Sequence, residues 1–186
     1  MMVARIMSCV GAFLALGAGA GALALEVEAL EWARAEPVSK AYSIETPCTA
    51  DEVALASVRP MPIGTARLNP TTQVVCKKGG LLFASGTSAG LEGDLAEGQS
   101  VFDVVIESVQ ATGGTLPEGA FDLIDGRRAI QNREGRDGIV AQTTIIEISE
   151  REVLMMLAGG PFDGNGAEMD VDALIDRHSA SLEIAQ

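Results

Sequence analysis

Residues 86–90 have the sequence Gly-Thr-Ser-Ala-Gly, which matches the G-x-S-x-G pattern of a nucleophile elbow around Ser88. An elbow holds its serine on a sharp turn between a strand and a helix, and residues 81–85 are apolar enough to form that strand. Glycines after Ser88 disfavour the helix that the elbow requires. We therefore predict a flexible loop over residues 86–98, with a small serine hydrolase using Ser88 as the alternative.

His178 is the only histidine in the chain, so any mechanism that pairs a nucleophile with an imidazole must use it. It follows Leu174 and Ile175 at helical spacing, on the apolar face of a helix expected over residues 170–182. This position predicts a partly buried structural side chain rather than a catalytic base. One imidazole also disfavours a histidine-based metal site.

Oxygen ligands of the kind that calcium prefers lie just before and at the start of that helix. They are Asp163, Asn165, Glu168 and Asp170. The segment departs from the EF-hand pattern, because Ala167 stands where a ligand belongs and Leu174 where the closing glutamate should be. A solvated loop with an acidic helix N-terminus explains the same residues. We expect no cofactor, with weak Ca²⁺ binding by a structural protein as the alternative.

Cys48 and Cys76 have neither the C-x-x-C spacing of a redox pair nor nearby residues that would complete a metal site. In an oxidising compartment an isolated pair of cysteines forms a disulfide. In the chain-entropy model, closing a loop of this length contributes about 3.5 kcal/mol. We predict a structural disulfide between Cys48 and Cys76.

Four arginines gather around one expected hairpin of an otherwise acidic chain. They are Arg127, Arg128, Arg133 and Arg136. A contact for an anion or a partner is one interpretation. Acidic residues are interleaved with them, which favours surface ion pairs of little energetic weight instead.

The 186 residues include 26 acidic and 13 basic side chains, for a formal net charge of −13. Such a field repels phosphate backbones and anionic headgroups, so nucleic-acid binding is excluded. The length suits one domain with a sizeable core.

Residues 1–24 have the pattern of an export signal. Arg5 precedes an apolar run from Ile6 to about Leu16, and the small-residue tract over residues 17–24 supplies A-x-A cleavage sites. We predict cleavage after Ala24, a periplasmic location and no stable membrane insertion of the cleaved chain. The alternative is an uncleaved N-terminal anchor, because the run is about long enough to span a bilayer.

The remaining sequence predicts an N-terminal arm or short helix over residues 25–40 and one α+β domain over residues 41–186. Period-two patterns and turn dipeptides predict strands over residues 41–46, 72–77, 81–85, 120–124, 127–132, 139–149 and 152–158. A capping box of Ser100 and Asp103 starts one helix, and the second is expected over residues 170–182. Short junctions make consecutive strands antiparallel neighbours, so we expect an antiparallel β-sheet with helices packed on it.

Several short sequence segments, in their order along the chain, resemble segments of the exported bacterial members of the PsbP-like fold family. After Trp32, residues 41–47 (Ala-Tyr-Ser-Ile-Glu-Thr-Pro) are similar to the family's opening F-S-I-x-x-P strand, and residues 81–85 (Leu-Leu-Phe-Ala-Ser) to its second hairpin. Residues 126–129 (Gly-Arg-Arg-Ala) resemble the start of its meander, and residues 177–182 (Arg-His-Ser-Ala-Ser-Leu) its closing R-F-x-x-S-F helix end.

The resemblance implies an α/β/α sandwich and a role in binding or assembly, because the family shares no catalytic constellation. The chain departs from the family at His178, which replaces the closing aromatic residue, and in its cysteine pair. We therefore expect a non-enzymatic periplasmic protein whose partner is another periplasmic protein or a small ligand.

Overall fold

The computed structural model describes residues 30–56, 61–63, 66–90, 95–111, 122–161 and 170–185. The predicted signal peptide lies outside these residues, as do three of the four predicted calcium ligands: Asp163, Asn165 and Glu168. Within the described part of the chain, neither helix has the length and apolar character needed to cross a bilayer.

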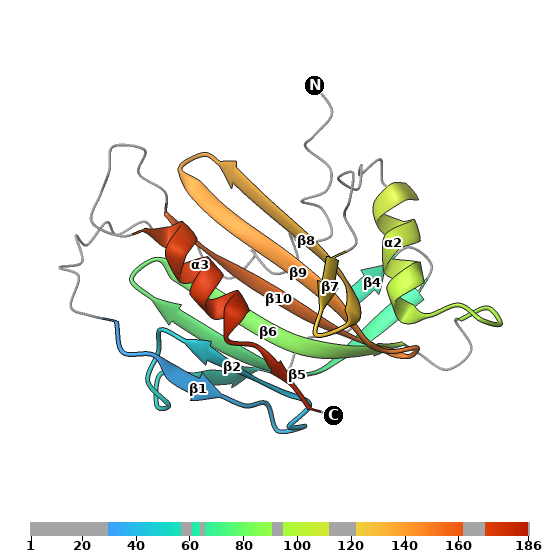
Figure 1. Cartoon of the computed structure of the whole chain (residues 1–186), viewed down its shortest axis with the longest axis horizontal. Coiled ribbons are helices and arrows are strands. Elements are labelled where there is room, and N and C mark those ends of the chain that lie inside the picture. The colour runs from blue at the N-terminus through green and yellow to red at the C-terminus, as the bar shows by residue number, and fades with distance from the viewer. Residues whose placement is uncertain are drawn as a thin grey trace.

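An antiparallel sheet of eight strands dominates the described chain (Figure 1). Its spatial order is β3 (Ala54–Ala56), β5 (Ala66–Lys78), β6 (Leu81–Gly90), β10 (Glu152–Pro161), β9 (Ile139–Ser149), β8 (Arg127–Arg136) and β7 (Asp122–Ile124). The eighth strand, β4 (Met61–Ile63), pairs with β5. The predicted antiparallel α+β class is therefore confirmed.

Two-residue turns connect β7 to β8 and β8 to β9. Asp125 and Gly126 join β7 to β8 with φ of 53° and 73°, and Asp137 and Gly138 join β8 to β9 with φ of 52° and 76°. Positive φ at both central residues matches the twist of adjacent antiparallel strands, which explains the Asp-Gly sequence at each turn.

A second sheet of three strands joins the two ends of the described chain. Its order is β1 (Ala33–Ala35), β2 (Tyr42–Thr46) and β11 (Glu183–Ile184). The sequence allowed a short helix over residues 25–40, but Ala33–Ala35 is a strand, with Ala33 opposite Thr46 and Ala35 opposite Ile44. This three-residue segment is extended because β2 supplies its hydrogen-bond partners, a tertiary effect that local helix propensity does not include.

Each helix covers a different face of the large sheet. α2 (Val101–Ala111) packs with Val153 and Ile130, while α3 (Val171–Ala180) packs with Phe83 and Leu81. Since side chains of successive strand residues point to opposite faces, the odd-numbered residues of β6 face α3 and the even-numbered ones face the side of α2. Reciprocal hydrogen bonds between Ser100 and Asp103 confirm the predicted capping box.

The prediction of a loop over residues 86–98 is wrong for residues 86–90, which belong to β6. Ladders on both sides hold this segment extended, with Ser88 opposite Val153 of β10 and Pro70 of β5. A Cβ on Gly90 would lie 2.5 Å from Cγ2 of Val101. This glycine therefore lets α2 approach the sheet and is not a sign of a loop.

Candidate functional site

His178 is completely buried between α3, β2 and the large sheet. Its Nδ1 lies 2.6 Å from the carbonyl oxygen of Glu45, which can only accept, so Nδ1 carries the proton. Its Nε2 has no hydrogen-bond partner among the described residues. The imidazole packs edge-on against Phe83, with ring centroids 4.8 Å apart. The sequence predicted partial burial, and the structure buries the side chain fully.

Burial lowers the pKa of His178 to about 4, and the hydrogen bond to Glu45 opposes this shift only in part. The imidazole is therefore neutral at pH 7, and its basic nitrogen faces the protein interior. A substrate in solvent therefore has no access to this nitrogen. His178 thus supports the packing of α3 on β2 and Phe83.

Ser88 lies within strand β6 and is also buried, with 2% of its surface exposed. Its hydroxyl has a contact of 3.9 Å with Sδ of Met155. Ser88 and Phe83 are five residues apart on one strand, so their side chains point to opposite faces of the sheet. The sheet backbone therefore separates Ser88 from His178, and the strand continues past Ser88 where an elbow would turn.

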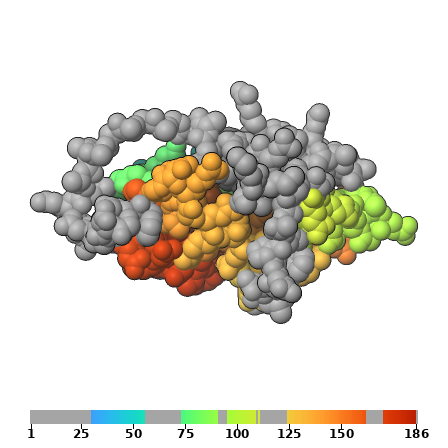
Figure 2. All heavy atoms as spheres, turned by 90° about the horizontal axis from the view of Figure 1, so that it is seen from above, coloured from blue at the N-terminus to red at the C-terminus, as the bar shows by residue number. Residues whose placement is uncertain are grey.

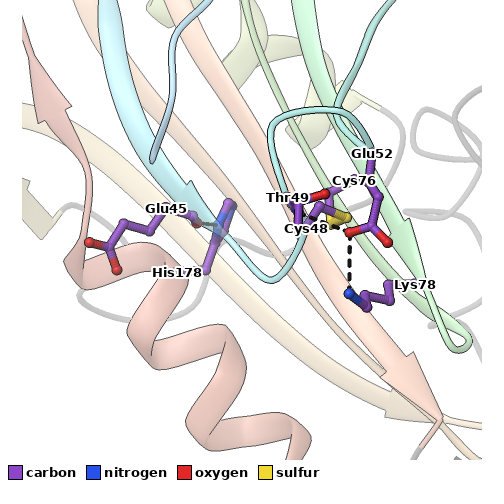
Figure 3. The surroundings of a disulfide bond; sticks show 7 residues. All are labelled: Glu45, Cys48, Thr49, Glu52, Cys76, Lys78 and His178. Atoms are coloured by element: carbon purple, nitrogen blue, oxygen red, sulfur yellow. Dashed lines mark hydrogen bonds and ion pairs between the residues drawn. A yellow bond between two sulfur atoms is a disulfide. The ribbon is translucent and has the colours of Figure 1, made fainter. Parts of the chain in front are cut away.

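The predicted disulfide between Cys48 and Cys76 is present, with the two Cα atoms 5.9 Å apart (Figure 3). Cys48 follows β2 of the small sheet, Cys76 belongs to β5 of the large sheet, and both are fully buried. Both pack in the same cluster as Leu81, Phe83 and Ile175. The bond therefore joins the two sheets covalently. It lies in the same apolar cluster as Ile175 of α3.

An ion pair lies beside the disulfide at the surface. Lys78 Nζ is 3.2 Å from Oε2 of Glu52, and the same carboxylate accepts a hydrogen bond from the backbone N–H of Thr49 at 2.8 Å. The bond from Thr49 is the main cause that lowers the pKa of Glu52, followed by Lys78. These contacts fix the turn that follows Cys48.

Arg128 anchors α2 to the sheet. Its guanidinium donates two hydrogen bonds to Glu147, at 2.6 and 2.7 Å, and one to Asp103 at 2.8 Å. It also lies over the ring of Phe102, 4.9 Å from the centroid. Hydrogen bonds from Arg128 lower the pKa of both carboxyl groups, although burial opposes the shift. The bidentate geometry makes this a structural clamp on the α2 face.

Arg133 anchors α3 on the opposite face. It donates to Oε1 of Gln142 at 2.9 Å and to Asp172 at 2.9 Å, and it also pairs with Asp176. Figure 2 shows α2 and the C-terminal segment in separate places, with strands β8 and β9 between them. Arg128 thus pairs with a residue of α2 and Arg133 with residues of α3, and the two helices cover different faces of the large sheet.

The two remaining arginines of the predicted partner patch also have partners within the chain. Arg127 donates to the carbonyl of Ile148 at 2.7 Å, and Arg136 pairs with Asp137 at 3.1 Å. The structure thus does not gather the four guanidinium groups on one face. A partner contact through them stays a prediction.

Asp170 is the one predicted calcium ligand among the described residues. It is the N-cap of α3, and its carboxylate accepts a hydrogen bond from the backbone N–H of Ala173 at 3.0 Å. In the described ranges no three His, Cys, Asp or Glu side chains lie together in an arrangement that could hold a metal ion. Calcium binding stays a prediction.

A buried polar group that the sequence did not reveal lies under the small sheet. Tyr42 donates to Oγ of Ser85 at 3.0 Å, and burial raises the pKa of Tyr42 to about 12. Gln142 donates to Oγ of Ser179 at 3.0 Å. The predicted strand over residues 41–46 includes Tyr42, but the hydrogen-bond partner of Tyr42 comes from another sheet and has no local signal.

Trp32 contacts both α3 and the large sheet. The guanidinium of Arg177 lies 4.2 Å from the centre of the Trp32 ring, and Trp32 meets Phe83 edge-on at 6.2 Å. Arg177 also pairs with Glu45 at 3.3 Å. The single tryptophan therefore reports on the contact between the small sheet, α3 and the large sheet.

No family model matches the sequence, and no curated protein matches it.

Proposed function

We propose that this chain is an exported, non-enzymatic binding or assembly protein of the periplasm. The observation that carries the proposal is the burial of its one histidine, whose Nδ1 binds the carbonyl of Glu45 and whose ring packs on Phe83. Ser88, the candidate nucleophile, is buried on the other face of the sheet. These side chains serve packing, which favours a function by binding over a function by nucleophilic catalysis.

The fully buried disulfide supports the proposed compartment, because such bonds form and persist outside the reducing cytosol. Residues 1–24, with their pattern of an export signal, support the same cellular location. The formal net charge of −13 favours a partner with a basic surface or a cationic ligand.

We further propose that the domain belongs to the PsbP-like fold family. A large antiparallel sheet with α2 and α3 on opposite faces supports this assignment. So does the position of His178, since its ring packs on Phe83 as a closing aromatic side chain would.

Counting free thiols in the chain from whole cells tests export and cleavage together. The sequence has three cysteines, and Cys9 lies in the predicted signal. We expect the periplasmic fraction to contain a chain that starts near Leu25 and takes up no maleimide under denaturing conditions until it is reduced. Labelling of one cysteine without reduction would indicate an uncleaved leader. Labelling of all three cysteines in the cytosolic fraction would contradict export.

A further inference from the structure

His178 lies where two layers of the fold meet. One layer contains α3 and the small sheet β1-β2-β11, and the other is the large sheet. Among the described strands, no β-ladder joins the two sheets. Side-chain packing, the Cys48–Cys76 disulfide and ion pairs such as that of Arg133 with Asp172 connect them. His178 lies beside Glu45 of β2 (Figure 3), to whose carbonyl it is hydrogen-bonded. Its ring also packs on Phe83 of β6, so it contacts both layers.

The surroundings of His178 fit a neutral ring and oppose a charged one. Nδ1 already donates to Glu45, and a second proton on Nε2 would create a donor with no acceptor in a fully buried position. A buried charge without a partner is costly. Protonation therefore requires the ring to reach water, and this means separating α3 from Phe83.

Charged side chains on the surrounding elements are engaged elsewhere. The carboxylate of Glu45 pairs with Arg34 and Arg177, while Arg133 of β8 pairs with Asp172 and Asp176. Glu183 of β11 pairs with Arg34. On β6, β9 and β10 the residues that face α3 near the ring are uncharged: Phe83, Gln142 and Ala158. The carboxylates of Glu45, Asp172, Asp176 and Glu183 are thus already paired with arginines.

We propose that His178 is an acid-sensitive latch, whose protonation separates the α3 layer from the large sheet while the Cys48–Cys76 disulfide keeps the two layers joined. The opened protein exposes Phe83 and Val140 on the face of the large sheet that α3 covers, together with Ile175 on α3 itself.

The direction of the pH effect follows from the two protonation equilibria. The pKa of His178 is about 4 in the closed protein, against 6.5 for an exposed imidazole. Between these values the open form takes up a proton that the closed form excludes, so closure is strongest above pH 6.5 and weakens as the pH falls towards 4. The ratio of open to closed protein should rise about 30-fold at pH 5 and about 300-fold below pH 4.

Fluorescence of Trp32, the only tryptophan, measures the opening in the full chain. We expect its emission to change between pH 6.5 and 4, because Trp32 contacts Arg177 of α3 and Phe83 of the large sheet. Circular dichroism should show that the β-structure persists through this change. Loss of the β-signal together with the Trp32 change would contradict a latch, since the whole domain would then unfold.

Two variants separate His178 from other groups that titrate in acid. His178→Gln keeps an N–H donor for the carbonyl of Glu45, and His178→Phe keeps a ring on Phe83. Each should move the Trp32 transition to lower pH by about one unit or more. Glu45→Gln removes the neighbouring carboxylate and should keep the wild-type transition. An unchanged transition in both His178 variants would overturn the proposal.

The wild-type chain offers a test without substitution. As the only histidine, His178 gives a single imidazole signal in an NMR spectrum of ¹³C-histidine-labelled protein. We expect the chemical shift of the closed form to stay that of a neutral ring, protonated at Nδ1, to below about pH 5. A closed form that titrates near pH 6.5, the value of an exposed imidazole, would overturn the latch.

Discussion

Replacing both cysteines, Cys48→Ala with Cys76→Ala, is expected to lower the free energy of unfolding by about 3.5 kcal/mol. The bond closes a loop across a sequence separation of 28 residues, so its loss returns conformational freedom to the unfolded chain. For a domain of this length the loss corresponds to a fall in Tm of roughly 10 °C. Calorimetry and urea unfolding would measure both quantities.

Loss of the disulfide should also change the coupling of the two sheets, because Cys48 follows β2 of the small sheet and Cys76 lies on β5 of the large sheet. Trp32 fluorescence, which reports on this interface, should therefore change at lower urea concentration than the circular dichroism of the variant. The wild-type chain with its disulfide reduced is the matched control and should unfold like the double variant. A double variant with the wild-type midpoint would show that the bond does not stabilise the domain.

Phe83→Ala should lower the free energy of unfolding by about 3–5 kcal/mol, the range for truncating a buried aromatic side chain. Phe83 is fully buried and contacts both Trp32 and His178. The truncation leaves a cavity where α3, the small sheet and the large sheet meet, and it removes two edge-on ring contacts. The expected stability loss can be measured by urea unfolding.

Leu55→Ala is the control for Phe83→Ala. Leu55 is 54% exposed, so its truncation should change the free energy of unfolding by no more than about 0.5 kcal/mol. Equal effects of the two substitutions would mean that Phe83 does not occupy the centre of the interface.

The sequence predicted those elements whose signals are local. The alternation over residues 139–149 gave both ends of β9, the Ser100–Asp103 pair marked the start of α2, and the Asp125-Gly126 dipeptide marked the turn between β7 and β8. Each of these patterns depends on residues close together in the chain, so local steric and hydrogen-bonding preferences are sufficient to produce them.

Elements that depend on distant partners were missed. Ala33–Ala35 is extended because of β2, and residues 86–90 continue β6 because β5 and β10 flank them. In the candidate site, the spacing of His178 indicated burial, but its hydrogen bond to Glu45 spans 133 positions and could not be foreseen. The same holds for the arginines, since Arg133 finds its carboxylate partners on α3 and not on its own hairpin.

A function by binding is tested by affinity purification of the tagged chain from the periplasm, after brief cross-linking in the living cell. We expect a partner that is captured at near-stoichiometric ratio and that binds again when both purified components are mixed. The tag exported without the domain serves as the control for non-specific capture and should not retain this partner. Recovery of neither a protein nor a small ligand above the control would contradict a function by binding.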